Sequence, residues 1–429
     1  MLPTIAADFA RFARRNMAAF FLDYVFFGLG LTFVNTSTIL PAFAARLTDS
    51  KILIGAVGAV WLGGWLLPQI AAANYLSDKR EKWPHLIRGS WLGRPFFWLY
   101  AIFLLLGGAR YPALALFLLL AGLLLFAITD AYAALAFFDL FGKAMPASDR
   151  GRVAGVGQMV NGTLAIGAGW LVQRLLSQAG PAFPYNYVYI FTLAGACFML
   201  SLAACYYIVE LPGEVKPTMA AWRDYLPRLG AVFKHDTAFT RVTAVRLLAG
   251  MHGMALPFYV IYATQVAGAP DSFIGIFLTA QTIGRAVAGL VLGAVAGRFG
   301  SHRVIQISVG LEILAVSVAL GLTLRQGASL AWVYPLMFAV IGVVEGSVVL
   351  GYFNYVLEIS PSDDRPTYMG LTNTLAGLLV VMPLIGGWLL EWTSYTTLFA
   401  LTTAGVAPAV LLSFALPRPH ASGDAAPGP

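Results

Sequence analysis

Charged residues are scarce in this chain. Asp, Glu, Lys and Arg make up 11% of the 429 residues, whereas hydrophobic residues make up 59%. Soluble globular domains contain about a quarter of charged residues, so this composition excludes a soluble globular protein. Cysteine is nearly absent too: Cys197 and Cys205 lie about 12 Å apart along one predicted helix, which is too far for a disulfide bond. A disulfide-linked extracellular domain is therefore excluded as well.

Motifs that carry enzyme chemistry are also missing. The sequence has no P-loop, and its five His residues are scattered, so we expect no enzymatic activity, no metal and no cofactor. The formal net charge of +7 comes from Lys and Arg distributed over short loops. Because these residues form no basic patch, we expect no nucleic-acid partner.

Long apolar runs dominate what is present. The sequence has about twelve apolar runs of roughly 20 residues, and each is long enough to cross about 30 Å of hydrocarbon as a helix. They are predicted at residues 18–44, 52–76, 88–109, 112–140, 152–178, 185–209, 240–266, 272–297, 303–325, 330–358, 367–391 and 394–415. Twenty of the 27 Lys and Arg residues, Arg94 among them, fall in loops on one side of these spans. The positive-inside rule then predicts a multi-pass protein of the plasma membrane with both termini in the cytoplasm.

One loop motif occurs twice. With an offset of 215, Pro146-Ala-Ser-Asp149-Arg150 matches Pro361-Ser-Asp-Asp364-Arg365. The same register equates Asp130 with Glu345 and Gln158 with Asn373. A duplicated membrane protein is most often a transporter. The repeat predicts an N-terminal bundle at 1–210 and a C-terminal bundle at 240–416, joined by a linker at 211–239 that carries an amphipathic surface helix and followed by a disordered tail at 417–429.

The loop after the second span carries a family resemblance. Its sequence, Asn74-Tyr-Leu76-Ser-Asp78-Lys79-Arg80-Glu-Lys82, is similar to the G-x-L-x-D-R-x-G-R-K signature of the major facilitator superfamily, with Asn in place of the first Gly. The loop after the eighth span, from Gly293 to Arg303, resembles the same signature with Gly297 in place of its Asp. The resemblance implies an all-α membrane protein with twelve transmembrane helices in two pseudo-symmetric six-helix bundles. It also implies a monomer with a central site near the bilayer midplane, lined by spans 1, 2, 4, 5, 7, 8, 10 and 11.

Ionisable residues within the spans are the first candidates for that site. Glu345 lies near the middle of span ten, where an unpaired carboxylate costs at least about 2.5 kcal/mol, so we expect it to be paired, hydrated or protonated. Arg285 lies at a similar depth in span eight, where the N-terminal half has Trp65, and we hypothesise an Arg285–Glu345 pair. The alternative is a static ion pair that only stabilises the bundle. Asp130, Asp23 and Arg246 are further candidates for substrate or proton binding, each with a structural or interfacial alternative.

Neutral polar and aromatic residues complete the predicted binding site, although residues of this kind more often pack between helices than bind a solute. They are Gln158, Asn373, Asn35, Tyr259, Tyr262, Gln281 and Trp61. Glu312 falls on span nine, outside the implied cavity, and is given no transport role.

The loop charges predict a cytoplasmic gate. In the family, the loop after span two latches against span eleven, so Asp78 is expected to meet the positive N-terminal end of span eleven. The alternative is that these charges only determine topology. The gating candidates are Asp78, Lys79, Arg298, Asp149, Arg150, Asp364 and Arg365.

The predicted function is that of a secondary active transporter for a small amphipathic or charged organic solute. We expect proton coupling, and export is favoured slightly over uptake, although span five lacks the Gly-Pro pair of drug/proton antiporters. The predicted partners are the solute, protons and the lipid bilayer. A proton-independent facilitator or an importer of sugars or metabolites remains the alternative. A membrane enzyme or a channel is the remote alternative.

Overall fold

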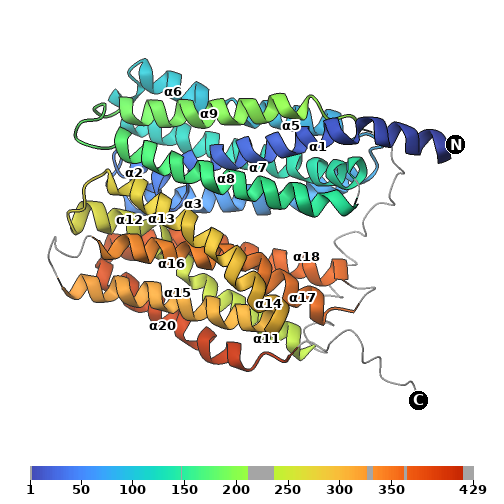
Figure 1. Cartoon of the computed structure of the whole chain (residues 1–429). Helices are drawn as coiled ribbons and strands as arrows, with labels where there is room; N and C mark the ends of the chain where they lie inside the picture. Colours follow the sequence, from blue (N-terminus) through green and yellow to red (C-terminus); the bar gives the residue numbers. More distant parts are fainter. Residues whose placement is uncertain (1, 146, 211–235, 326–331, 362–364, 419–429) are drawn as a thin grey trace. The chain divides into compact units, whose positions relative to one another are not determined.

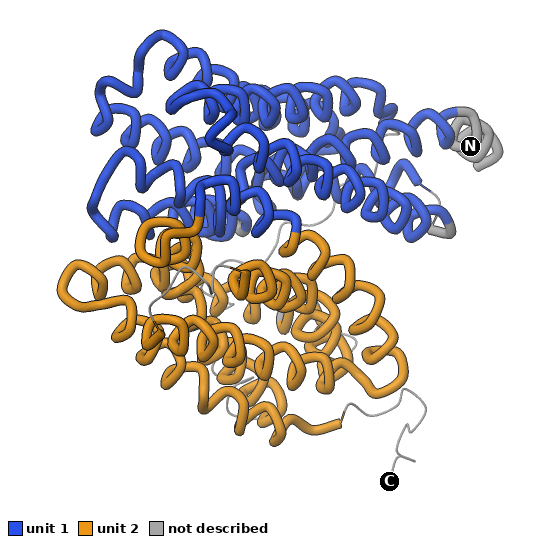
Figure 2. The backbone as a smooth tube through the Cα atoms, turned by 60° about the vertical axis from the view of Figure 1, so that its left-hand side comes forward, with its two compact units in different colours: residues 1–219, 270–279 blue, residues 220–269, 280–429 orange. Residues whose placement is uncertain are grey.

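The computed structural model describes residues 2–145, 147–210, 236–325, 332–361 and 365–418. Every regular element in these ranges is a helix (Figure 1). The chain divides into two compact units, which Figure 2 shows in different colours. Unit 1 contains residues 1–219 and 270–279, and unit 2 contains residues 220–269 and 280–429. The predicted surface helix of the linker and the predicted tail fall mostly within 211–235 and 419–429, outside the described residues.

Unit 1 is built on long helices that pack along one another. Helix α1 packs against α8 and α9, and α7 packs against α3 and α5. The elements of this unit are α1 (Leu2–Phe33), α2 (Ile39–Ala44), α3 (Lys51–Leu66), α4 (Gln69–Ser77), α5 (Trp83–Gly93), α6 (Phe96–Leu105), η1 (Gly108–Arg110), α7 (Pro112–Ala144), α8 (Ala147–Leu175) and α9 (Tyr185–Cys205). Residues 270–279, which include the first turns of α13 (Phe273–Val287), also belong to unit 1.

Unit 2 has more interrupted helices. Helix α15 packs against α16 and α20, and α11 packs against α20. The elements are α11 (Thr237–Ala249), η2 (Gly250–Met254), α12 (Leu256–Ile261), η3 (Tyr262–Val266), the remainder of α13, η4 (Ala288–Leu292), α14 (Gly293–Phe299), α15 (Ser301–Leu324), α16 (Val333–Val348), η6 (Val349–Phe353), α17 (Asn354–Ile359), α18 (Arg365–Ala376), η7 (Gly377–Val381), α19 (Met382–Trp392) and α20 (Tyr395–Phe414).

Proline and π-helical turns account for several of the interruptions. Pro68 separates α3 from α4, and Pro95 separates α5 from α6, because proline has no N–H for the helix ladder. In unit 2, η3, η4 and η6 are π-helical turns, a form of helix that is frequent at functional sites. η4 and η6 each divide one predicted span into consecutive helical segments, whereas η3 forms the end of another.

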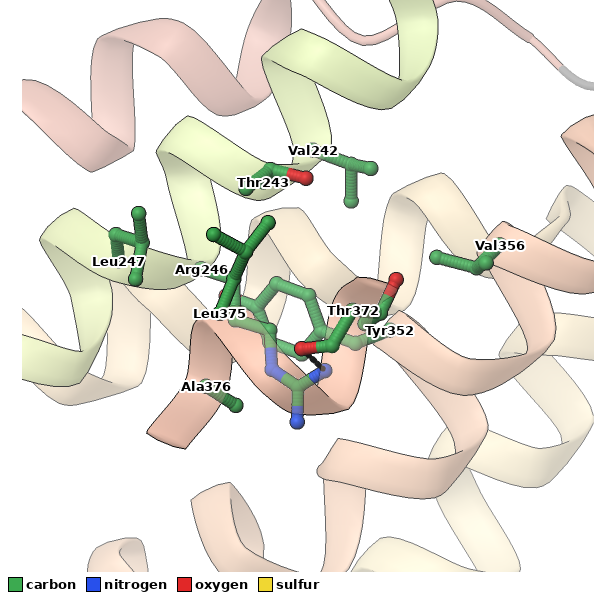
Figure 3. A pocket seen from close by; sticks show the side chains of 9 residues that line it. All are labelled: Val242, Thr243, Arg246, Leu247, Tyr352, Val356, Thr372, Leu375 and Ala376. Atoms are coloured by element: carbon green, nitrogen blue, oxygen red, sulfur yellow. Dashed lines mark hydrogen bonds between the residues drawn. The ribbon is translucent and has the colours of Figure 1, made fainter. Parts of the chain in front are cut away.

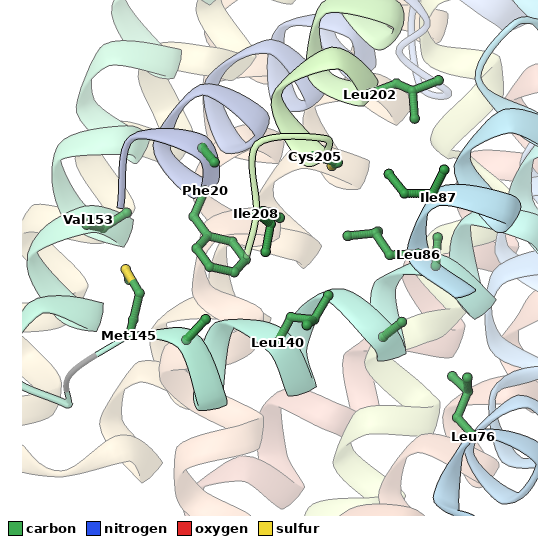
Figure 4. Packing of buried hydrophobic residues seen from close by; sticks show 14 residues of the cluster. Phe20, Leu76, Leu86, Ile87, Leu140, Met145, Val153, Leu202, Cys205 and Ile208 are labelled. Atoms are coloured by element: carbon green, nitrogen blue, oxygen red, sulfur yellow. The ribbon is translucent and has the colours of Figure 1, made fainter. Parts of the chain in front are cut away.

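Hydrophobic side chains fill each unit. In unit 1, one cluster joins α1, α7 and α9 through Phe20, Leu140 and Leu202, and it includes Ile208 just after α9 (Figure 4). In unit 2, Phe239 of α11, Tyr355 of α17, Leu371 of α18 and Val406 of α20 belong to one buried cluster. These cores hold the polar residues of each unit in place.

The all-helical membrane fold is confirmed, with a difference in detail. Among the described residues, ten helical runs are long and apolar enough to cross a membrane. The two other predicted spans coincide with α5 and α6, which are interrupted at Arg94 and Pro95, and with α8, which is 29 residues long and rich in Gly and polar residues. The count of twelve crossings and the cytoplasmic position of the termini stay predictions.

Candidate functional site

The Arg285–Glu345 pair lies at the contact between α13 and α16. Arg285 Nε and Nη2 both approach Glu345 Oε2 at 2.7 Å. Gln281, one turn before Arg285 on the same helix, donates its amide to both carboxylate oxygens at 2.8 and 2.9 Å. The structure therefore brings together three residues that the sequence proposed. We call Gln281, Arg285 and Glu345 the carboxylate cluster.

Glycines allow the two helices of this cluster to approach closely. A Cβ atom on Gly342 would lie 2.0 Å from the carbonyl oxygen of Gln281, and one on Gly284 would lie 2.0 Å from the carbonyl oxygen of Ala339. Gly346 faces Arg285 across the same contact. Because glycine has no side chain, the backbones of α13 and α16 touch at these points. This contact keeps the Glu345 carboxylate within reach of Gln281 and Arg285.

Exposure differs among the three members of the cluster. The Gln281 residue is 1% exposed, whereas the side chains of Glu345 and Arg285 are 29% and 45% exposed. Of the three side chains, the Arg285 guanidinium is thus the most exposed. Gln281 binds the Glu345 carboxylate from the buried side. A pair that is partly open exchanges partners more readily than a fully buried pair, whose separation leaves an uncompensated charge.

The repeat places a different set of residues at the equivalent point of unit 1. Asp130 on α7 corresponds to Glu345, and Trp65 on α3 corresponds to Arg285. Asp130 lies within hydrogen-bonding reach of the Trp65 side chain. Trp61 stacks on Phe126 with ring centroids 5.5 Å apart. Unit 1 therefore has aromatic side chains where unit 2 has an amide and a guanidinium.

Asp23 belongs to a buried network inside unit 1. Arg94 Nη1 lies 3.2 Å from Asp23 Oδ1, and both side chains are 6% exposed. Ser201 and Cys205 of α9 also donate to Asp23 Oδ1. The assignment of Arg94 to the cytoplasmic loops was wrong: the helix of span three begins at Trp83, earlier than predicted, so Arg94 lies at the α5–α6 break and is buried. An Arg next to a proline inside an apolar run indicated a buried charge, but not the acid with which it pairs.

Arg246 lines a small pocket of unit 2. Its Nη1 donates to the Thr372 carbonyl oxygen at 3.4 Å, and its guanidinium carbon lies 5.8 Å from the centre of the Tyr352 ring (Figure 3). Thr243 also lines this pocket. Among the described residues, Arg246 forms no salt bridge with a carboxylate. The remaining lining residues are Val242, Leu247, Val356, Leu375 and Ala376.

The two predicted tyrosines are packed inside unit 2. Tyr259 stacks on Phe399 with ring centroids 5.4 Å apart, and its hydroxyl lies 3.3 Å from His252 Nδ1. The Tyr262 hydroxyl donates to the Leu322 carbonyl oxygen at 3.4 Å. Both residues are at most 6% exposed, so a solute reaches neither in this structure.

The predicted amides have separate surroundings. The side-chain oxygen Oδ1 of Asn35 accepts hydrogen bonds from the backbone N–H and the hydroxyl groups of Ser37 and Thr38, and these bonds close the turn after α1. Gln158 of α8 accepts a short hydrogen bond from the Tyr24 hydroxyl. Asn373 is half-buried on α18. Asn35 thus shapes the backbone, whereas Gln158 links two helices of unit 1.

The predicted gating residues make local contacts. Asp78 pairs with Lys79 at 3.1 Å, and the side chains are 59% and 34% exposed. Arg150 donates to the carbonyl oxygens of Met145 and Gly142, so it caps the end of α7. The others are Asp149 in the first turn of α8, Arg298 beside Phe299 and Arg365 at the start of α18. Asp364 lies outside the described residues, and the latch between Asp78 and span eleven stays a prediction.

A second polar network ties the loop after α4 to the ends of α7 and α9. The Glu210 carboxylate accepts the backbone N–H groups of Lys82 and Trp83, and it lies 3.7 Å from Lys143 Nζ. Lys143 in turn pairs with Asp139 at 2.7 Å. Burial lowers the pKa of the Lys82 ammonium. Sequence reasoning missed this network because Glu210 lies far from the loop in the chain.

Part of the chain matches a family model in sequence, and the whole chain is similar to solved transporters in fold. Residues 242–428 match the model of the Major Facilitator Superfamily, and no curated protein matches the chain. The fold is similar to that of a bacterial homologue of the iron transporter ferroportin in an inward-facing state, with a TM-score of 0.70 and 13% identity over 94% of this chain and 98% of that chain. It is also similar to a mutant form of the nucleoside transporter NupG, with a TM-score of 0.69 and 14% identity over 94% of this chain and 99% of that chain. A D-xylose–proton symporter has a TM-score of 0.65 and 13% identity over 95% of this chain and 97% of that chain.

Proposed function

We propose that the chain, whose residues 242–428 match the model of the Major Facilitator Superfamily, is a member of that superfamily and a secondary active transporter of a small charged or amphipathic organic solute, coupled to protons. Transporters of this kind move a solute by alternating access to a site near the bilayer midplane. Glu345 carries the coupling proton in this proposal, and Arg285 binds an anionic group of the solute. The observation that supports both roles is the partly exposed carboxylate cluster.

The geometry of the cluster supports coupling between the two roles. An ionised Glu345 accepts two charge-assisted contacts from Arg285 and two amide bonds from Gln281. A proton on Glu345 removes the negative charge that holds Arg285. The guanidinium then has donors free for a carboxylate or phosphate group, which its planar fork fits. Proton binding and anion binding therefore favour each other at this site.

The order of exposure supports an anionic rather than a cationic group on the solute. Arg285 is the more exposed member of the pair, so a solute that approaches unit 2 meets a positive charge before it meets Glu345. Binding of proton and anion together drives uptake under an inward proton gradient. Export, which the sequence favoured slightly, requires instead that proton and solute replace each other at the pair.

Transport by purified protein in liposomes tests the proposal. A thermal-shift screen of organic anions, cations and neutral solutes first selects a ligand, and its uptake is then measured with and without a pH gradient of either direction. We expect an anionic ligand whose accumulation follows the inward proton gradient in the wild type. In Glu345→Gln the solute should still exchange across the membrane but should no longer accumulate.

The control variant is Asp49→Asn, which removes an exposed acid in the loop before α3. Its transport should equal that of the wild type. Accumulation by Glu345→Gln with an unchanged dependence on the pH gradient would contradict the role of Glu345. Equal transport with and without any pH gradient in the wild type would favour the proton-independent facilitator, and no solute movement at all would favour the membrane enzyme or channel.

A further inference from the structure

Glu312 is a buried acid that the transport mechanism above does not use. It lies on α15 and is 7% exposed. Within the described part of the chain, its Oε2 atom has no hydrogen-bond partner. A buried carboxylate without a partner is rare, because the loss of water disfavours the ionised form strongly. The neutral, protonated acid is the form that these surroundings can hold.

Other buried polar atoms gather around the same helix. Helix α15 packs against η6, which carries Tyr352, and against η2, which carries His252. Over the ranges that the structure describes, the Tyr352 hydroxyl and His252 Nε2 also lack hydrogen-bond partners. Glu312 is close enough to act electrostatically on both Tyr352 and Tyr259. Two tyrosines of unit 2 therefore lie near this buried acid, and His252 lies on a third segment that packs against α15.

A pocket lies beside this region of unit 2. Tyr352 lines the pocket together with Arg246 and Thr243 (Figure 3). In the described chain, the buried Thr243 hydroxyl also has no hydrogen-bond partner. Tyr352 contributes both to the wall of the pocket and to the surroundings of Glu312.

The elements packed against α15 contribute few other charges near Glu312. Helix α20 has no charged or His residue. On α16, Ser347 donates to Ser308, one turn before Glu312. Glu345 is two positions from Ser347, about 200° around the helix, and pairs with Arg285 of α13 instead. Arg298 of α14 and Glu358 of α17 lie near the start of α15, where Glu358 accepts from Ser301.

We propose that Glu312 is a second proton-binding site, buried within unit 2 near Tyr259 and Tyr352. Its ligand is a proton and not the solute, since the acid is buried within unit 2. The site is separate from the carboxylate cluster, which lies on the α13 side of α16. It rests on the proposed function only in assuming that bound protons matter to transport; proton occupancy itself is independent of the solute.

Infrared spectroscopy of the purified full chain tests proton occupancy directly. A protonated carboxylic acid has a C=O stretching band that an ionised carboxylate lacks. We expect such a band near neutral pH in the wild type, loss of one component in Glu312→Gln, and retention of that component in Glu345→Gln. Asp130→Asn serves as a further control, because it replaces another acid of the spans and should retain that component as well. A band in Glu312→Gln identical to that of the wild type would overturn the proposal.

A second variant keeps the test decisive if Glu312→Gln does not fold. Tyr352→Phe removes a polar group near the acid and leaves the acid in place, so the Glu312 band should remain but shift because the electrostatic environment of its C=O group changes. A missing or unshifted band would overturn the site. If Glu345→Gln accumulates solute like the wild type, the proposed coupling role of Glu345 fails, whereas the infrared result still decides whether Glu312 binds a proton.

Discussion

Each unit holds an ion pair between an arginine and an acid within its predicted membrane helices, and the two pairs differ in their surroundings. In unit 1, Asp23 and Arg94 are both 6% exposed and share Ser201 and Cys205 as further partners. In unit 2, Arg285 and Glu345 are 45% and 29% exposed. The same charges therefore serve different purposes. Full burial makes the first pair part of the scaffold, whereas partial exposure leaves the second free to exchange partners.

The largest effect is expected when the buried pair is broken. Arg94→Met leaves Asp23 without its cation in an apolar core, and removal of one partner from a buried pair costs about 3–5 kcal/mol. We expect a marked loss of stability in detergent, measured by thermal unfolding and by titration with a denaturing detergent. The additional change Asp23→Asn should recover part of the loss, because it removes the uncompensated charge.

Lys79→Met is the matched control for this prediction. Its partner Asp78 is 59% exposed, and exposed pairs contribute only about 0–1 kcal/mol. If Arg94→Met and Lys79→Met lost the same small amount of stability, the pair in unit 1 would not be a structural element and the contrast between the units would disappear.

The helix contact beneath the carboxylate cluster comes next. A Cβ atom on Gly342 would meet the Gln281 carbonyl oxygen at 2.0 Å, so Gly342→Ala must separate α13 from α16. Overpacking of this kind costs about 1–3 kcal/mol. We expect lower thermal stability together with weaker pH-driven transport, since Gln281 and Glu345 move apart.

Substitutions at two other glycines serve as comparisons for Gly342→Ala. Gly310→Ala on α15 places its Cβ in open space, so no loss of stability is expected. The equivalent contact of unit 1 is less close, because a Cβ on Gly64 would lie 2.8 Å from the Ala127 Cβ. Gly64→Ala should therefore lower the stability less than Gly342→Ala. An equal loss in all three variants would show that the close contact is not special to the cluster.

Arg285→Lys should have an intermediate effect on function. Lysine keeps the positive charge but cannot place two donors against one carboxylate group. Transport of the anionic solute should fall about tenfold, which corresponds to about 1.4 kcal/mol, with little change in thermal stability. The control is Arg174→Lys in the last turn of α8, where the exposed guanidinium lies beside the Trp170 ring. Equal transport by both variants would argue against a bidentate role for Arg285.

The sequence was sufficient to predict the pair in unit 2 but not the pair in unit 1. Arg285 and Glu345 lie in the middle of apolar runs, where a charge needs a partner, and the repeat indicated which spans carry them. Arg94 lies close to a predicted span end, and an apolar run does not reveal that α5 begins earlier, at Trp83. Its pairing with Asp23 depends on how α1, α5 and α9 pack, which no local pattern encodes.

The neutral polar residues show a similar limit. Asn35 was predicted to face a solute, but the spacing Asn-x-Ser-Thr closes a turn, a local alternative that short polar side chains offer to the backbone. Glu312 was set aside because of the span on which it lies. Only its burial and its missing hydrogen-bond partner within the described chain single it out. The helices follow from composition, whereas the partner of each polar group follows from tertiary packing.

Asp130→Asn gives the smallest expected effect and tests the repeat itself. Asp130 is equivalent to Glu345, but it has Trp65 and not an arginine at the matching position of the neighbouring helix. Because Arg94, the cation that acts electrostatically on Asp130, is paired with Asp23, neutralising this acid should change pH-driven transport by no more than about threefold, or about 0.6 kcal/mol. The measurement is the same liposome assay, with Glu345→Gln beside it. A loss in Asp130→Asn as large as that in Glu345→Gln would mean that both halves of the repeat carry the coupling, and that the difference between tryptophan and arginine does not decide which acid works.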